Sequence, residues 1–390
     1  CRDRTIPLGL GMLDVFKNVF GARDTRTDEE PRTTEDIRVA TCALFLDDVE
    51  VPVENLVGGV EGQGLVQAQQ VFGYTRLMVA AFGLGGGWAA VDRAITYAFN
   101  RIQGGSPLSE KQGLTHKLIV PHVVRLEAAR AYIEETATRI DAGEGENGAL
   151  NTEGAIAKYL ATEAGNSAAE AAIQVHGGYG YTRPYIVEKI KRDVRITTIY
   201  EGTSEIMEMT IGRDRWQHHL KTKGDHYRVQ AAELARLHVA NPSIGADVAA
   251  LATEALAGVF SAAQTGRLTR NQHIQFRLGE MAAVVEGAGA LCRRAAAAAD
   301  GSIASKSDRR FSPEVLATIC RVYAREAALK VADDGVRWVA GGSAAAGVDS
   351  AELAATLAAT LRLDEVRAAQ AGLIADMDAI NAALYADLTA

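Results

Sequence analysis

The chain is poor in cysteine and in long apolar runs, and each shortage excludes a class of protein. Its 390 residues include only four cysteines, none of which forms a C-x-x-C pair, so neither a zinc site nor a disulfide framework is expected. The expected environment is therefore a reducing compartment. No apolar run reaches the ~20 residues that a membrane-spanning helix needs, and the chain shows no targeting segment.

Positive charge is also scarce. The chain has 41 Lys and Arg residues against 49 Asp and Glu residues, which gives a net charge of −8 and a pI near 5.6. Non-specific nucleic-acid binding needs clustered cations that displace counterions from phosphates, so nucleic acid is not an expected partner. No strongly basic amphipathic helix stands out, and attachment to a membrane surface therefore has no support in the sequence.

Helical periodicity, in contrast, is abundant and begins near residue 63. Pro121 should kink or break one of the predicted helices. Long helices with short connections favour an antiparallel bundle over residues 63–219. Apolar residues recur at three- and four-residue spacing in five segments, which we predict to be helices: 63–101, 107–141, 152–176, 184–197 and 204–219. First-turn prolines and polar N-caps are expected at Pro107, Pro184, Asn151 and Thr152.

The segments that flank this bundle differ from it. Within residues 1–62, Ile37–Pro52 is interpreted as two short strands of a β-hairpin, which must pack on something else to be stable. Residues 220–245 are polar and linker-like. The Ala-rich runs 246–299, 312–341 and 350–386, the last two separated by Gly341-Gly342, predict an appended helical domain over 246–386. The fold class is thus mostly α, with no internal repeat of fixed period.

Two motifs that resemble cofactor or metal sites do not support one. Gly83–Gly87 lacks the G-x-G-x-x-G spacing, because position 88 is Trp, and it lies inside a helical pattern with no preceding strand. We interpret these glycines as a close contact between helices. His218 and His219 would project about 100° apart on a helix and cannot share a ligand face. The E-x-x-H pairs of a di-iron bundle are missing, so no metal site is expected.

Three other segments could support chemistry, and each also has an ordinary structural explanation. The three glycines of Gln174–Thr182 would let backbone N–H groups approach a phosphate, or they form a simple helix C-cap and loop. Glu201 lies just before a helix and is either a general base or a helix-capping acid. Arg101, beside a glycine turn and ahead of Gln112, is either an anion clamp or a solvated loop residue.

Together these segments, in this order and spacing, resemble the acyl-CoA dehydrogenase family. Gln174 precedes Glu201 by 27 residues, and Arg101 precedes Gln112 by 11, as in that family's pattern. The resemblance runs from about residue 37 to residue 217. It implies the C-terminal helical bundle of such an enzyme, with residues 1–62 as a remnant of the middle β-domain. Residues 246–386 are similar to the extra helical domain of the very-long-chain branch.

The resemblance also implies an activity. This is FAD-dependent α,β-dehydrogenation of a fatty acyl-CoA thioester to the trans-2-enoyl-CoA, a step of fatty acid β-oxidation, with electrons passed to an electron-transfer flavoprotein. Glu201 would be the catalytic base. The cofactor-binding positions carried over from the family are Arg101, Gln112, Gln174, Gly177, Gly178, Thr203 and Glu205. The substrate-binding positions are Tyr74, Arg76, Tyr200, Gly202 and Arg213.

Assembly and location follow from the same resemblance. Gln174, Gly177 and Gly178 would reach the FAD of a neighbouring subunit, which implies a homodimer or a dimer of dimers. The expected location is the bacterial cytoplasm or the mitochondrial matrix.

The sequence departs from the family pattern at three points. Gly73 stands where many members have an Asp or Asn that contacts the CoA arm, and Gly104 replaces the usual Phe of R-x-x-F-G. The N-terminal helical domain and most of the β-domain are missing, so the chain alone is expected to be inactive and to bind FAD weakly. A non-catalytic scaffold of the same fold stays an open alternative. A third alternative is a related flavoprotein of the same fold, such as an oxidase or a monooxygenase. Glu201 argues against the monooxygenase, which needs no base for an α-proton.

Overall fold

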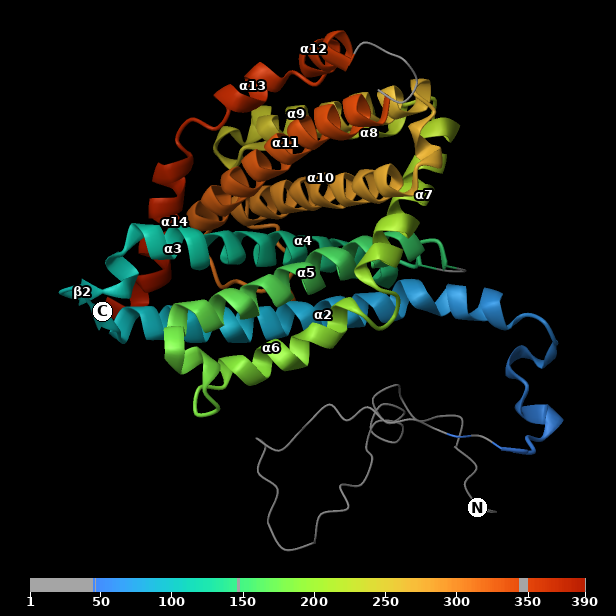
Figure 1. Cartoon of the computed structure of the whole chain (residues 1–390), viewed down its shortest axis with the longest axis horizontal. Helices are drawn as coiled ribbons and strands as arrows, with labels where there is room; N and C mark the ends of the chain where they lie inside the picture. Colours follow the sequence, from blue (N-terminus) through green and yellow to red (C-terminus); the bar gives the residue numbers. More distant parts are fainter. Residues whose placement is uncertain (1–44, 46, 146–147, 344–349, 390) are drawn as a thin grey trace, which may run out of the picture. The chain divides into compact units, whose positions relative to one another are not determined.

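The structure is a computed structural model that describes residues 45, 47–145, 148–343 and 350–389 (Figure 1). The chain divides into two units, Cys1–Gly64 and Leu65–Ala390. The described part of the first unit contains two short 3-10 helices, η2 (Val53–Asn55) and η3 (Val57–Gly59).

The predicted N-terminal hairpin is only partly within the described residues. Its first strand lies outside them, and residues 47–52, which are described, form no strand. Asp48 has φ 45°, a turn conformation that comes just before the second predicted strand. Residues 49–52, which should form that strand, pair with no other strand in the described part of the chain, so this part of the prediction is wrong.

The second unit is built from helices and one short hairpin. The strands β1 (Ile102–Gln103) and β2 (Ser106–Pro107) pair antiparallel, with Ile102 opposite Pro107 and Gln103 opposite Ser106. The helices up to residue 221 are α2 (Gly64–Asn100), α3 (Gln112–Leu118), α4 (Val120–Asp141), α5 (Asn151–His176), α6 (Val187–Arg195) and α7 (Ser204–Lys221), with the 3-10 helices η4 (Leu108–Glu110), η6 (Gly177–Tyr181) and η7 (Ile196–Thr198).

The later helices form a second layer on the first. They are α8 (Asp225–Ala240), α9 (Ala246–Thr265), α10 (Gln272–Ala299), α11 (Pro313–Ser343), α12 (Ser350–Thr360), α13 (Leu363–Ala368) and α14 (Leu373–Thr389), with η8 (Pro242–Ile244) and η9 (Leu268–Arg270). Helices α2, α4 and α5 lie in one layer, α8 to α11 lie above it, and α7 crosses between the two (Figure 1). Helix α10 packs against α4, α7, α9 and α11, so one hydrophobic core runs through both layers.

Glycines allow the closest helix crossings in this core. A Cβ atom on Gly83 of α2 would lie 2.9 Å from the Cα of Thr162 in α5, and one on Gly165 would lie 2.2 Å from the carbonyl oxygen of Gly83. Between the layers, a Cβ on Gly279 of α10 would lie 2.1 Å from the carbonyl oxygen of Glu208 in α7. Real Cβ contacts are not this short, so only glycine fits. The interpretation of Gly83–Gly87 as a helix contact is confirmed.

The sequence predicted most helices but misplaced several ends. The predicted break at Pro121 is confirmed, because α3 ends at Leu118 and α4 starts at Val120. Pro107, expected in a first turn, instead lies in β2, and α6 begins at Val187 rather than at Pro184. The N-cap of α5 is Leu150, not Asn151 or Thr152. The side chains of Asn151 and Thr152 instead bond to Arg76 and Asp214, so tertiary contacts replace capping.

The predicted linker over residues 220–245 is wrong. Residues 225–240 form α8, which buries Tyr227, Ala231 and Leu234 at four- and three-residue spacing. This narrow apolar stripe is enough to hold a polar helix against α9. Gly341-Gly342 does not end α11 either, which continues to Ser343.

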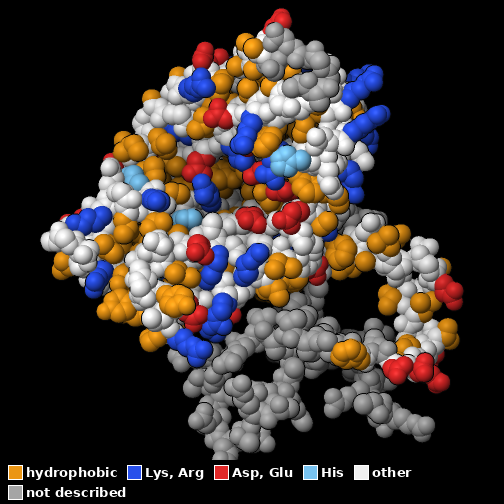
Figure 2. Space-filling model, viewed as in Figure 1, with side chains coloured by type: hydrophobic (Ala, Val, Ile, Leu, Met, Phe, Trp, Pro, Cys, Tyr) orange, Lys and Arg blue, Asp and Glu red, His pale blue; other side chains and the backbone are white. Residues whose placement is uncertain are grey.

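The sequence predicted no membrane-spanning helix. Among the described residues, however, α9 is the one helix that is long and apolar enough to cross a membrane. Most of it is buried in the protein, and it packs against α8, α10 and α11, so its composition suits a core helix. On the face shown in Figure 2, side chains of both signs are interspersed without a continuous patch of one sign.

Candidate functional site

The backbone around Glu201 is a strained turn between η7 and α7. Glu201 has φ 58° and Gly202 has φ 94°, so two consecutive residues lie in the left-handed half of the φ range. That conformation is unfavourable for a residue with a Cβ and persists only where neighbouring groups enforce it. Thr203 then caps α7, its hydroxyl accepting a hydrogen bond from the Ile206 amide at 3.4 Å.

Helix α2 holds this turn from one side. The hydroxyl of Thr75, which is buried, donates to Oε2 of Glu201 at 3.0 Å. The buried Arg76 points Nε at the carbonyl oxygen of Glu201 at 3.4 Å, and its Nη1 donates to Oδ1 of Asn151 at 2.8 Å. Arg76, which the resemblance placed at the substrate, thus contacts the protein here, and its substrate contact stays a prediction.

Helix α5 holds the turn from the other side. Lys158 is completely buried, and its Nζ donates to the carbonyl oxygen of Gly202 at 2.8 Å. Burial, reinforced by the nearby charge of Arg76, lowers the pKa of Lys158 to about 8. The sequence analysis missed this residue, although a single cation inside the apolar stretch Ala155–Ala161 was an available signal.

The other positions assigned to substrate lie around the same turn. Burial and the neighbouring Glu201 raise the pKa of Tyr200 to about 12, so its phenol stays neutral. Tyr74 is 58% exposed, next to Thr75, and lines a surface hollow with Gln70 and Leu150. Arg213 donates from Nε to Oδ1 of Asp214 at 2.7 Å and remains half exposed.

Thr203 and Glu205 also belong to this end of the bundle. Glu205 is exposed in the first turn of α7, where hydrogen bonds from its own backbone N–H and from Thr203 lower its pKa. A negative charge at a helix N-terminus is stabilised by the helix dipole, so Glu205 is ionised at neutral pH. The structure therefore places Arg76 against the Glu201 turn, in which Tyr200 and Gly202 lie, while Tyr74 lines a separate hollow and Arg213 pairs with Asp214 on α7.

A second cluster lies at the opposite end of α2 and α5. Arg101 follows α2, and its guanidinium lies 5.9 Å from the ring centroid of Tyr179, just after Gly177 and Gly178. Gly177 has φ 60°, and a Cβ on either glycine would meet nothing within 4 Å, so the backbone is open to a ligand. The side chains of Gln174 and Arg101 are exposed beside it. An exposed cation and open backbone N–H groups suit a pyrophosphate.

Gln112 is near this second cluster but is already engaged. Its Nε2 donates to Oδ1 of Asp378 on α14 at 2.9 Å, and His116 approaches the same oxygen at 3.0 Å. The C-terminal helix therefore packs on the α3 position that the resemblance assigned to the cofactor.

The two clusters are far apart within one chain. An α-helix rises about 1.5 Å per residue, so Arg76 and Arg101 are about 37 Å apart along α2. A dinucleotide is shorter than this span. Arg76 and Arg101 of one chain consequently cannot both contact the same dinucleotide.

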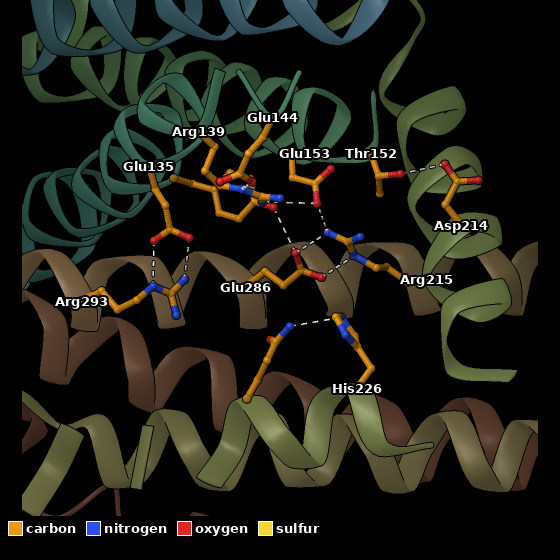
Figure 3. A network of polar contacts seen from close by, with 12 residues as sticks. Glu135, Arg139, Glu144, Thr152, Glu153, Asp214, Arg215, His226, Glu286 and Arg293 are labelled. Carbon is orange, nitrogen blue, oxygen red and sulfur yellow. Dashed lines mark hydrogen bonds and ion pairs between the residues drawn. The ribbon is translucent and has the colours of Figure 1, made fainter. Parts of the chain in front are cut away.

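A buried polar network joins the Glu201 end of the bundle to the second layer (Figure 3). Glu286 of α10 accepts two hydrogen bonds from Arg215 of α7, at 2.6 and 2.8 Å, and one each from Tyr132 and Tyr227 at 3.0 Å. Burial opposes ionisation of Glu286, yet the Arg215 guanidinium holds its pKa below the usual value. Next to Arg215, Asp214 accepts a hydrogen bond from Thr152 at 2.9 Å.

One family profile matches the sequence of both helical layers. The sequence profile described as "Acyl-CoA dehydrogenase, C-terminal domain" matches residues 62–215 and again residues 223–365. We call these the first and second matched segments. The sequence analysis did not detect this recurrence, because it looked for short repeats of fixed period.

Individual relatives match part of the chain at moderate identity. A protein named acyl-CoA dehydrogenase from Bacillus subtilis is 39% identical over 175 residues, which is 44% of each chain. A 3-(aryl)acrylate reductase from Clostridium sporogenes is 36% identical over 171 residues, again 44% of each chain. The matches thus span less than half the length of these relatives.

A solved structure supports the fold of the whole second unit. The crystal structure of an acyl-CoA dehydrogenase from Bacillus anthracis, complexed with FAD, superposes with a TM-score of 0.64 at 18% identity, over 84% of this chain and 57% of that one. At this identity the likeness shows the fold alone. With the profile matching most of residues 62–365, the chain belongs to the acyl-CoA dehydrogenase family.

Proposed function

We propose that this chain is the C-terminal part of a flavoenzyme that dehydrogenates a fatty acyl-CoA thioester to the trans-2-enoyl-CoA. The observation that supports this most is the Glu201 turn, in which a carboxylate is held in a left-handed backbone conformation against Thr75. A scaffold protein of the same fold would have no reason to maintain that strain, because strained backbone is characteristic of functional sites.

In this proposal Glu201 removes the proton from the α-carbon of the thioester. The Thr75 hydroxyl orients Oε2, so we assign the proton transfer to Oε1. The α-proton is acidic only when the thioester oxygen is stabilised as negative charge develops, and the Glu201 backbone N–H is the donor that this chain offers. FAD, when bound, accepts the hydride from the β-carbon. Removal of a proton and a hydride accounts for the new double bond.

The same residues serve the reverse reaction, because a base that removes the α-proton returns it as an acid. Several relatives are named reductases, including the caffeyl-CoA reductase–Etf complex subunit CarC of Acetobacterium woodii. That name supports an electron-transfer flavoprotein as the redox partner of this protein as well.

The separation of the two clusters supports a shared cofactor site. Arg101, Gln174, Gly177 and Gly178 fit a pyrophosphate, but Arg101 lies about 37 Å from Arg76 along α2, and Gln174 lies about 24 Å from Lys158 along α5. We therefore assign them to the FAD of a neighbouring subunit, while Thr203 and Glu205 would lie near the flavin of their own. The protein would then be at least a homodimer, and light scattering at micromolar concentration tests this: a monomer unchanged by FAD contradicts it.

The test of the base is Glu201→Gln in the full-length flavoprotein that contains this chain. The amide keeps the shape of the side chain but accepts no proton, so the rate of flavin reduction by acyl-CoA should fall by about 10²–10⁴-fold or more. Flavin content, read from absorbance, should not change. Activity within about tenfold of the parent would contradict the assignment. A parent protein that binds no flavin would favour the scaffold alternative.

A further inference from the structure

The buried cations of this chain fall into two groups. Among the described residues, the buried lysine and arginine side chains are Arg76, Lys158, Arg215 and Arg294. Arg215 and Arg294 are paired with carboxylates, those of Glu286 and Glu134. In the part of the chain that the structure describes, neither Arg76 nor Lys158 has a carboxylate within ion-pair distance. Both point at backbone carbonyl oxygens of the Glu201–Gly202 turn.

A buried cation without a carboxylate partner is expensive for stability. Removing an ammonium group from water costs several kcal/mol, and one hydrogen bond to a carbonyl returns only a part of that cost. Lys158 is the extreme case, because none of its surface is exposed. An apolar residue would pack more favourably among Ala155, Ile156 and Ala161 if stability alone mattered.

We propose that Lys158 is a positioning residue for proton transfer, because its ammonium group fixes the Gly202 carbonyl and so holds the left-handed turn that presents the Glu201 carboxylate. The inference rests on the proposed role of Glu201 as the base. Three donors then hold the turn: Thr75 holds the carboxylate, Arg76 the Glu201 carbonyl and Lys158 the Gly202 carbonyl.

The backbone conformation explains why the turn needs this support. Glu201 has φ 58°, which is unfavourable for a residue with a Cβ atom, and Gly202 follows with φ 94°. Without the Lys158 bond, the Gly202 carbonyl loses the donor that holds it, and Glu201 can relax toward an ordinary conformation. A displacement of about 1 Å in a catalytic group can lower the rate about 10²-fold.

The charge state of Lys158 depends on four groups from the elements that surround it. Arg76 of α2 disfavours the ammonium form, whereas Glu163 of α5, Glu201 of the turn and Glu205 of α7 favour it. The neutral amine keeps N–H groups that can bond to Gly202, so the geometric role does not require the charge at every pH.

The test isolates proton removal from hydride transfer. A 3-thia-acyl-CoA has sulfur in place of the β-carbon, so it can lose an α-proton but cannot give up a hydride. Exchange of its α-protons with D2O, followed by NMR on the flavin-loaded full-length enzyme, therefore reports the base and its geometry. Binding of the same thioester and the flavin content are measured in parallel.

Lys158→Met removes the donor while keeping the approximate length of the side chain. We expect exchange to fall about 10²-fold, while thioester affinity and flavin content stay within about threefold, the pattern of an interaction that acts on the chemical step. Lys158→Gln keeps an N–H donor on a side chain one atom shorter, and its exchange rate should lie between those of the parent and the methionine variant. If Lys158→Met does not fold, the test rests on Lys158→Gln, whose exchange rate should be lower than that of the parent.

Lys330→Met is the matched control. Lys330 is also partly buried, but it is bound to Glu280 and Asp334 on α10 and α11, away from the turn. Its exchange rate should equal that of the parent. Parent-level exchange in a folded, flavin-loaded Lys158 variant would overturn the role of Lys158 alone. An exchange rate that Glu201→Gln leaves unchanged would instead overturn the proposed function.

Discussion

Gly177-Gly178 in the first matched segment and Gly341-Gly342 in the second each lie at the C-terminal end of a long helix, yet only the first pair ends its helix. α5 stops at His176, and a Cβ on Gly177 or Gly178 would meet no atom. α11 continues through the second pair, and a Cβ on Gly342 would lie 2.6 Å from Ile274. Both glycines of the first pair are thus open to solvent, whereas in the second pair Gly341 is open and Gly342 packs against side chains.

The two segments also differ in what a buried or partly buried cation contacts at corresponding positions. Ile156, Ala161, Glu163 and Ala164 of α5 recur at identical spacing in α11, as Ile319, Ala324, Glu326 and Ala327. This spacing places Arg321 where the first segment has Lys158. Arg321 donates from Nε to Oδ2 of Asp376 at 3.0 Å and from Nη1 to the Ser243 carbonyl. The second segment therefore pairs its cation with a carboxylate, whereas the first uses it to hold the Glu201 turn.

Glu286→Ala should have the largest effect on stability, because it removes the central carboxylate of the network that joins the two segments. It leaves the buried Arg215 guanidinium without its main partner, and breaking a buried ion pair in this way typically costs about 3–5 kcal/mol. Chemical denaturation of the full chain measures the loss as a lower midpoint. Glu365→Ala, which removes an exposed partner of Arg362, is the control and should leave the midpoint nearly unchanged, because water screens an exposed ion pair. Equal effects would show that the network contributes little.

Gly165→Ala tests the close helix crossing that is specific to the first segment. The new Cβ would lie 2.2 Å from the Gly83 carbonyl oxygen, which is backbone and cannot rotate away. Helices α2 and α5 must separate, at an expected cost of about 1–3 kcal/mol. Because Thr75 and Lys158 lie on these helices, flavin reduction should slow as well. A variant as stable as the parent would contradict the close approach of α2 and α5 at Gly165.

The pH dependence of stability offers a third test, on Lys158. Its pKa is about 8 in the folded chain against 10.5 for an ordinary lysine, so between these pH values the unfolded chain binds more protons. The free energy of unfolding contributed by Lys158 therefore rises from about pH 8 to pH 10.5. Lys158→Met lacks this rise, so its stability relative to the parent should be highest below pH 8 and decline above it. Parallel stability curves for the two proteins would contradict the lowered pKa.

Gly342→Ala should have the smallest effect and is the counterpart of Gly165→Ala. Its Cβ meets the far ends of the Ile274 and Leu268 side chains, which can rotate away, and no backbone atom is among its nearest contacts. Alanine is favoured over glycine in a helix interior by about 1 kcal/mol, which offsets the repacking. We expect the free energy of unfolding, measured by chemical denaturation, to change by less than about 1 kcal/mol. A loss as large as that of Gly165→Ala would remove the distinction between the two segments.

The sequence allowed the elements of the site to be predicted better than their contacts. The apolar period placed α2, α5 and α7 within a few residues of their ends, and spacing relative to the family located Glu201. The role of Lys158 was missed, because its partner Gly202 is 44 residues away and a sequence pattern does not show which helix faces meet. Helix α8 was missed for another reason: its three buried residues are too few to stand out among polar neighbours.

The network around Glu286 also sets an order of events during synthesis. Arg215 and Glu286 are 71 residues apart, so at a typical 5–20 residues per second the ribosome makes Glu286 about 4–14 s after Arg215. During that interval Arg215 has no carboxylate from α10, and Glu153 of α5 is the partner that the first segment itself offers. The part of the first segment around Arg215 is therefore completed only after α10 has emerged and packed.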